Sequence, residues 1–82
     1  DVHGRLGDIY MQRQVWDKAD AHLRQAVELN PYYSAAFRSL GVLHYFHLND
    51  PYNGANFLRR SLHLQPNQPD AGRLRQLISN IP

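Results

Sequence analysis

The chain has 82 residues, of which 43% are hydrophobic and 20% are charged, and its formal net charge is +2. This length suits one domain with a single modest core, and the composition is that of a folded globular protein rather than a disordered one. Cysteine is absent from the sequence, which excludes disulfides and thiolate zinc sites. No dense run of Lys or Arg indicates a nucleic-acid-binding surface, and no apolar stretch approaches the roughly 20 residues of a membrane-spanning helix. We therefore expect neither a nucleic acid partner nor membrane insertion.

The first residue is Asp1, with neither an initiator Met nor a signal-peptide pattern after it. We interpret the sequence as a fragment of a longer protein. Nothing in it identifies a compartment, and a soluble, cytoplasmic protein is the default expectation.

The hydrophobic spacing predicts five helices, at residues 2–13, 17–30, 35–48, 51–65 and 69–80. Asp17 is a suitable N-cap for the second helix, and Asp50 is an N-cap followed by Pro51 in the first helical position of the fourth. Pro31 and Pro66 follow the second and fourth helices and end them, because proline has no N–H and clashes with the preceding turn. The fifth helix carries one apolar stripe and is expected to cap the domain: Ala71, Leu74, Leu77, Ile78 and Ile81.

Self-comparison reveals an internal repeat. Leu6-Gly7 recurs as Leu40-Gly41 after 34 residues, and the segment 26–31 recurs as 61–66 after 35 residues. The unit is a helix–turn–helix used twice, with one residue inserted in the second copy. We therefore expect a single domain over 1–82, with a first repeat at 1–33, a second repeat at 34–68 and a capping helix at 69–82.

This pattern resembles the tetratricopeptide repeat family. The matching residues of the first copy are Leu6, Gly7, Tyr10, Ala19, Leu23, Ala26 and Pro31. Those of the second copy are Phe37, Leu40, Gly41, Gly54, Leu58, Ser61 and Pro66, with His44 where the family usually has Tyr. The resemblance covers residues 1–66. It implies an all-α fold in which antiparallel helix pairs form a short right-handed solenoid, and a function in binding other proteins.

The resemblance also implies that the first helix of each pair lines a concave groove that accepts peptides. The candidate groove residues are Asp8, Met11, Gln12, Arg38, Val42, Tyr45 and Phe46. Aromatic and Arg side chains are the usual energetic anchors of such surfaces. Phe46 lies on a side of the helix that is usually polar and is the better candidate for an exposed anchor, whereas Tyr45 could equally pack between the repeats.

Some members of the family clamp carboxylates with Lys and Asn placed one turn apart on the first helix. Gly4 and Asp8 occupy those positions here. Because an anion would repel a carboxylate, this clamp is not expected. Asp20 occupies a helix position that is usually apolar in the family, and we expect it to be exposed at the open end of the stack.

Several alternatives remain open. The open ends of the stack, with Ile9, Ile78 and Ile81, could drive self-association into a homo-oligomer, because two repeats give little stacking. An Arg-rich face formed by Arg59, Arg60, Arg73 and Arg75 could bind an acidic partner. His44, His47 and Asp50 have a spacing that zinc could use, although packing is the preferred role of His44. We predict no metal, no cofactor, no catalytic residue and no enzymatic activity.

Overall fold

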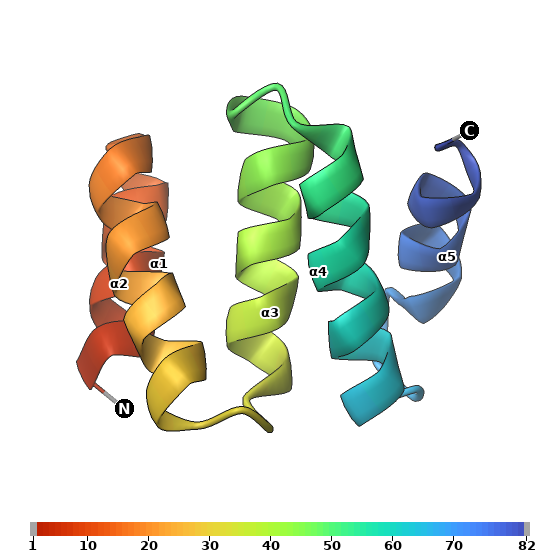
Figure 1. Ribbon diagram of the computed structural model, residues 1–82, viewed down its shortest axis with the longest axis horizontal. Helices are drawn as coiled ribbons and strands as arrows, with labels where there is room; N and C mark the ends of the chain where they lie inside the picture. The colour runs from red at the N-terminus through yellow and green to blue at the C-terminus, as the bar shows by residue number, and fades with distance from the viewer. Residues whose placement is uncertain (1, 82) are drawn as a thin grey trace.

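The structure is a computed structural model that describes residues 2–81. This part of the chain forms five α-helices and one π-helical turn, in the order α1 (Val2–Gln12), α2 (Trp16–Leu29), α3 (Ser34–Val42), η1 (Leu43–His47), α4 (Pro51–Leu64) and α5 (Ala71–Ser79). The pair α1 and α2, with α2 in front of α1, stands at one end of a row that continues with α3, α4 and α5 (Figure 1). The all-α fold expected from the sequence is confirmed.

Two antiparallel helix pairs, α1 with α2 and α3 with α4, are packed in the same way. A Cβ atom on Gly7 would lie only 2.5 Å from the side chain of Leu23, and a Cβ on Gly41 would lie 2.5 Å from that of Leu58. Each glycine therefore lets its helix approach the leucine of the partner helix more closely than any side chain would permit. The internal repeat in the sequence corresponds to this repeated contact.

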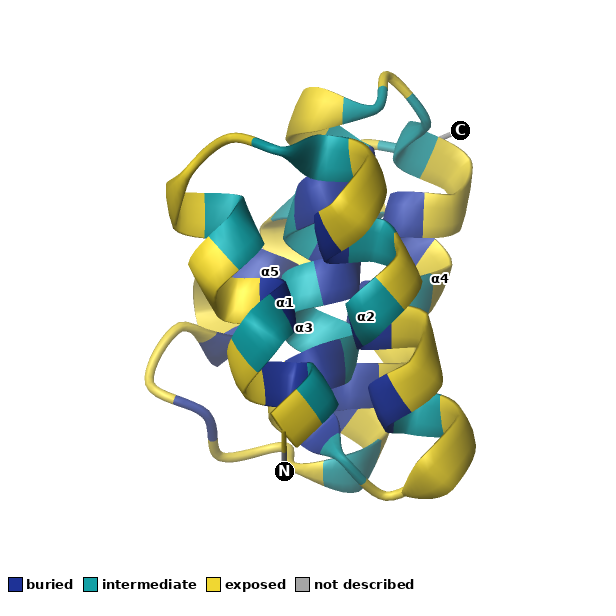
Figure 2. Cartoon of the chain, turned by 90° about the vertical axis from the view of Figure 1, so that its left-hand side faces the viewer, coloured by how far each residue is buried: buried dark blue, intermediate teal, exposed yellow. Residues whose placement is uncertain are grey.

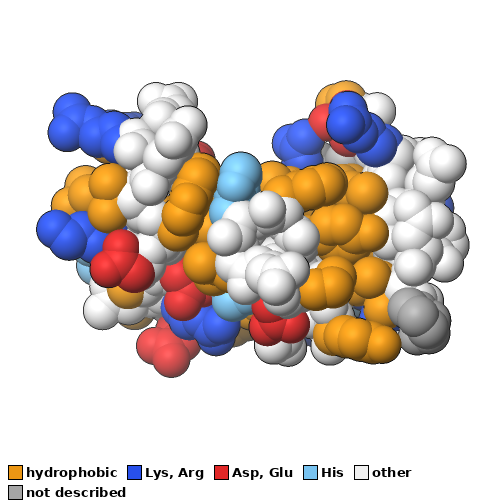
Figure 3. Space-filling view, turned by 90° about the horizontal axis from the view of Figure 1, so that it is seen from above, with side chains coloured by type: hydrophobic (Ala, Val, Ile, Leu, Met, Phe, Trp, Pro, Cys, Tyr) orange, Lys and Arg blue, Asp and Glu red, His pale blue; other side chains and the backbone are white. Residues whose placement is uncertain are grey.

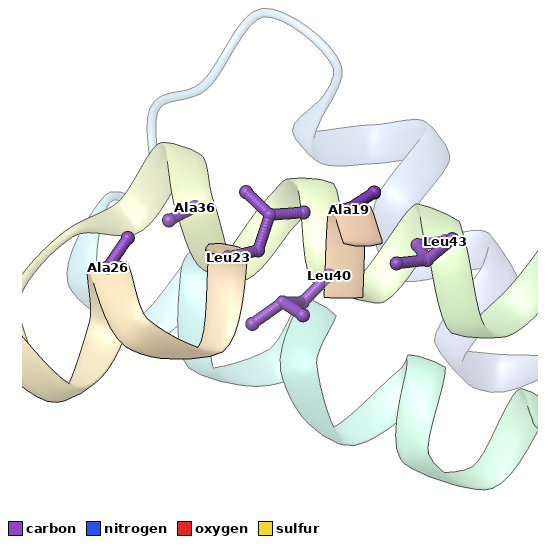
Figure 4. Close-up of a cluster of buried hydrophobic side chains, with 6 residues drawn as sticks. All are labelled: Ala19, Leu23, Ala26, Ala36, Leu40 and Leu43. Carbon is purple, nitrogen blue, oxygen red and sulfur yellow. The ribbon is translucent and has the colours of Figure 1, made fainter. Parts of the chain in front are cut away.

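The core runs through the row of helices in two clusters. The first joins the two pairs and consists of Ala19, Leu23, Ala26, Ala36, Leu40 and Leu43 (Figure 4). The second joins the second pair to α5 and consists of Leu58, Leu62, Ala71 and Leu74. Figure 2 shows the resulting pattern, in which each helix has buried residues on the side facing the other helices and exposed residues on its outer side. Small residues and leucines make up the fully buried part of the core, and partly buried aromatic side chains such as Tyr10, Trp16 and Phe57 pack against it.

Three predicted helix starts differ from the structure by one or two residues, and α3 begins at Ser34 rather than at residue 35. The helix α2 begins at Trp16, and its N-cap is Val15, so Asp17 lies exposed in the first turn and does not cap the helix. Its carboxylate still lies near the positive end of the helix dipole. The helix α5 begins at Ala71 rather than at residue 69, with Asp70 as its N-cap residue. Asp50 does cap α4, with Pro51 in the first turn as predicted.

The one-residue insertion of the second repeat is absorbed by the π-helical turn η1. In each repeat the turn between the paired helices contains one residue of positive φ, Gln14 at 62° and Asn49 at 53°. These two residues are 35 positions apart, whereas Gly7 and Gly41 are 34 apart, so the extra residue lies between 41 and 49. There the backbone N–H of Leu48 bonds to the carbonyl of Leu43, five residues earlier. A helix turn widened by one residue accommodates the insertion without displacing α4.

Asp20 is not exposed at the open end of the stack, contrary to the expectation from the sequence. Its side chain is 24% exposed, and its carboxylate faces the second repeat, where one oxygen lies 2.8 Å from Nε2 of the buried His44. Arg24 donates from Nε to both carboxylate oxygens at 3.0 Å. This polar contact joins the two repeats through His44, which stands where the first repeat has Tyr10.

A buried polar cluster fixes the segment between α4 and α5. Gln68 is 8% exposed, and its side-chain Nε2 donates to Oγ of Ser61 at 2.8 Å and to the carbonyls of Ser61 and Gln65 at 3.1 Å each. Ser34 and Ser61 also exchange hydrogen bonds with each other across α3 and α4. Buried polar groups that are fully paired hold a segment in one conformation. Gln68 thereby fixes the connecting segment that leads into α5.

Candidate functional site

A groove of about 200 Å³ opens between the α3–η1 segment and α5. It is lined by Arg38, Val42, Phe46, Asp70, Arg73, Leu74 and Leu77. These residues come from α3, from η1, from the N-cap of α5 and from α5 itself, so the groove depends on the packing of α5 against the second repeat. A concave site with an apolar lining and few polar groups is the usual form of a ligand-binding surface.

The apolar part of the groove consists of Val42, Phe46, Leu74 and Leu77. Leu74 is buried and belongs to the second core cluster, whereas Phe46 is 53% exposed. In the space-filling view, hydrophobic side chains gather over the half of the molecule that holds α3, α4 and α5, with basic side chains at the edge of this area (Figure 3). A half-exposed phenylalanine beside buried leucines offers apolar area that a partner could cover.

The charged rim of the groove consists of Arg38, Asp70 and Arg73. The guanidinium of Arg38 donates from Nη2 to the carboxylate of Asp70, and the two side chains are 42% and 51% exposed. The Nε of Arg38 is buried and has no hydrogen-bond partner among residues 2–81. Two guanidinium groups and one carboxylate leave this rim with a net positive charge.

The structure brings together only some of the predicted groove residues. Asp8, Met11 and Gln12 lie on α1 and are not part of this lining. The carboxylate of Asp8 accepts a hydrogen bond from Ser39 at 3.2 Å, and Met11 packs against the first core cluster. Gln12 is exposed at the end of α1.

Tyr45 also stands apart from the groove lining. Its side chain is half-buried against the second core cluster, and its hydroxyl donates to the carbonyl of Leu77 at 3.2 Å. The ring centroid of Phe46 lies 4.9 Å from that of Tyr45. Tyr45 therefore attaches η1 to α5, and it also supports the neighbouring Phe46.

Sequence reasoning missed Asp70, Leu74 and Leu77 as groove residues. It assigned the two leucines to the apolar stripe of a capping helix, which explained them without any binding role. The signal that could have identified them is their spacing. Asp70, Arg73, Leu74 and Leu77 follow one another at intervals of three and four, so these charged and apolar side chains share one side of α5.

The two histidines considered for zinc turn to different neighbours. His44 lies against Asp20, and Oδ2 of Asp50 lies 3.9 Å from its Nδ1. The ring of His47 stacks on Trp16 with centroids 3.9 Å apart. Within residues 2–81 no group of three or more His, Cys, Asp or Glu side chains is arranged to hold a metal ion.

Hydrogen bonds from the side chain and backbone of Asn53 hold the pKa of Asp50 below its ordinary value of 3.8.

The Arg-rich face considered above is divided among local contacts. Arg59 donates to Asn56 at 2.9 Å, Arg60 lies 5.9 Å from the ring centre of Phe37, and Arg75 donates to the carbonyl of Pro66 at 3.2 Å. Arg73 is the member of this set that lines the groove.

A second surface lies at the opposite end of the row of helices. Val2, Arg5, Leu6 and Ile9 line a shallow pocket of about 330 Å³ on α1, and Val2 and Ile9 are 69% and 38% exposed. This pocket is larger than the groove, but all four of its residues come from one helix. It is the free face of the first repeat rather than a site assembled from several elements.

In the described part of the chain, 2–81, none of the helices has the length and apolarity that crossing a membrane would require.

A comparison with curated proteins finds a similarity to part of a much longer protein. Over 67 residues, 82% of this chain, the sequence is 33% identical to Protein O-mannosyl-transferase Tmtc2 of Drosophila melanogaster. The match covers 7% of the length of that protein. No family model matches the chain. No solved structure matches it either.

Proposed function

We propose that this chain is a non-catalytic protein-interaction module that binds a peptide segment of another protein in the groove between α3–η1 and α5. The observation that carries the proposal is the exposure of Phe46, 53%, on the rim of a groove whose floor is apolar. Two resemblances support it: the repeat pattern of tetratricopeptide proteins, and the similarity of most of the chain to a short stretch of a much longer protein. A short helical-repeat segment within a long chain is suited to hold a partner.

The chemistry of the groove supports binding rather than reaction. Its side chains are aliphatic, aromatic and guanidinium groups, together with one carboxylate that is paired with Arg38. Such groups recognise apolar and charged surfaces. We therefore propose that the module binds a partner and catalyses no reaction.

The contribution of Phe46 to binding can be calculated from its exposure. A phenylalanine buries about 150–250 Å² in full, so a ligand that covers the exposed half would remove roughly 100 Å² from water. At about 25 cal/mol per Å² this is about 2.5 kcal/mol, or roughly sixtyfold in affinity.

The test is selection of peptides from a random phage-displayed library on the immobilised protein, followed by affinity measurement on synthetic copies by fluorescence anisotropy. Phe46→Ala and Arg38→Glu should weaken binding, the first by roughly sixtyfold, while far-UV circular dichroism is unchanged. Tyr52→Ala is the matched control, because Tyr52 is an aromatic residue of similar exposure, 60%, that does not line the groove. Peptides that bind the two groove variants as well as the wild type would refute the proposal.

A second candidate function is self-association through the N-terminal face. Val2, Leu6 and Ile9 form an apolar surface on α1 that no described helix covers. Ile78 and Ile81 at the other end of the row are half-buried. Light scattering over a concentration series tests this candidate: a mass that increases with concentration in the wild type and not in Ile9→Glu supports it, and a constant monomer mass at high micromolar concentration rejects it.

A further inference from the structure

Asp70 occupies the N-cap position of α5 but does not cap this helix. No cap hydrogen bond from its side chain is formed within residues 2–81, and its φ and ψ of −98° and 18° differ from the extended backbone usual for a cap. Asp50, by contrast, accepts a hydrogen bond from the backbone N–H of Asn53 at the start of α4. The carboxylate of Asp70 is instead directed across the groove to Arg38.

The contact between these two side chains leaves Arg38 incompletely paired. A guanidinium binds a carboxylate best through two parallel N–H groups, and its Nε–H and Nη2–H form one such fork. Asp70 accepts from Nη2 alone, while Nε is buried and without a partner among the described residues. A carboxylate that approached along the groove could accept from both nitrogens.

The surroundings of the pair favour an anion with apolar neighbours. Arg73 lines the same groove and is exposed, so displacement of Asp70 would leave two guanidinium groups facing the ligand. Val42, Phe46, Leu74 and Leu77 form the adjacent apolar surface. Charge complementarity therefore selects a segment that carries Asp or Glu next to large apolar residues.

We propose, on the basis of the function proposed above, that the ligand is an acidic, hydrophobic peptide segment whose carboxylate displaces Asp70 from Arg38. In the free protein Asp70 takes the place of that carboxylate and keeps Arg38 directed into the groove. The displaced Asp70 remains at the N-terminal end of α5, where the helix dipole favours a negative charge. Separation of Asp70 from Arg38 therefore costs little free energy, since both side chains are already about half exposed to water.

The experiment uses each peptide recovered by the library selection and a copy in which its Glu or Asp residues are replaced by Gln or Asn. The acidic peptide should bind the wild type about fivefold more tightly than its neutral copy, the upper value for an exposed ion pair. Arg38→Gln should remove most of this difference. Asp70→Asn should tighten binding of the acidic peptide about twofold to fivefold and leave the neutral copy unchanged, because an internal competitor has been removed.

The matched control is Asp17→Asn. It changes the net charge by the same amount at an exposed position of α2 outside the groove. If Asp70→Asn has no more effect than Asp17→Asn, or if acidic and neutral peptides bind equally, the inference is wrong. Equal binding that Phe46→Ala still weakens would leave the groove as the binding site and reject only the acidic ligand. A selection that returns no peptide sensitive to Phe46→Ala would reject both proposals.

Discussion

Two glycines in helices should respond in opposite directions to the same substitution. A Cβ on Gly54, in α4, would lie 2.7 Å from the backbone nitrogen of Tyr45 and 2.8 Å from its Cβ. A Cβ on Gly72, in α5, would have no atom within 4 Å. Neither glycine has positive φ, so alanine fits the backbone conformation at both positions. Contact between helices is then the main difference between Gly54→Ala and Gly72→Ala.

The magnitudes follow from these contacts. Non-bonded atoms prefer separations of about 3.5–4.0 Å, so Gly54→Ala must push α4 and η1 apart by about 1 Å. Such overpacking costs about 1–3 kcal/mol, and the upper value applies because backbone atoms cannot rotate away as a side chain can. Alanine recovers about 1 kcal/mol of helix propensity. The net effect is destabilisation by about 2 kcal/mol for Gly54→Ala, against stabilisation by about 0.4–1 kcal/mol for Gly72→Ala.

Thermal unfolding followed by circular dichroism measures both effects. At about 4–8 °C per kcal/mol for a domain of this size, Gly54→Ala should lower the Tm by about 8–16 °C, and Gly72→Ala should raise it by about 2–8 °C. Urea titration should give the same order of free energies of unfolding. A Tm for Gly54→Ala equal to or above that of the wild type would refute the close approach of α4 to η1 on which this reasoning depends.

Three further changes test the polar contacts. Asp20→Ala removes the carboxylate that lies 2.8 Å from Nε2 of the buried His44 and should cost about 1–3 kcal/mol in urea titration. Asp17→Ala on the exposed face of the same helix should change stability by less than about 0.5 kcal/mol. Gln68→Glu places a carboxylate against two carbonyl oxygens and should destabilise more than Gln68→Ala, with the faster amide hydrogen exchange confined to α5; equal exchange throughout the chain would contradict this. The lowered pKa of Asp50 makes its contribution to stability present above pH 3.8, the ordinary value, and lost as the pH falls through the folded-state pKa. Asp50→Asn, which can still cap the helix, should therefore be less stable than the wild type at pH 7 and converge with it in strong acid, and a difference that persists there would show that charge is not the cause.

The repeated part of the fold could be predicted from the sequence because each unit uses the same residue for the same contact. Gly7 and Gly41 are recognisable as a pair, and the leucines that they approach, Leu23 and Leu58, recur with nearly the same spacing. Helix order and the all-α class follow from this regularity and from the prolines that end two helices. A sequence pattern that occurs twice indicates that the two units have the same local structure.

The candidate site could be predicted only in part, because it depends on where a non-repeated element packs. Arg38, Val42 and Phe46 were identified as groove residues, but the other wall comes from α5, whose register departs from the repeat. The connecting segment that leads into α5 is held by Gln68, a polar residue that becomes buried. No periodicity in the sequence distinguishes such a glutamine from an exposed one. Asp20 was misjudged for a similar reason, since its partner His44 lies in the other repeat.

The π-helical turn η1, which absorbs the inserted residue of the second repeat, contributes side chains both to contacts with the neighbouring helices and to the groove. In this turn, three consecutive side chains have three different neighbours. His44 contacts Asp20 of the first repeat, and the hydroxyl of Tyr45 bonds to the carbonyl of Leu77 on α5. Phe46 is left exposed on the rim of the groove. Because the first two side chains hold the turn from both sides, Phe46 is presented from a fixed backbone, which reduces the entropy that a ligand must overcome to use it as an anchor.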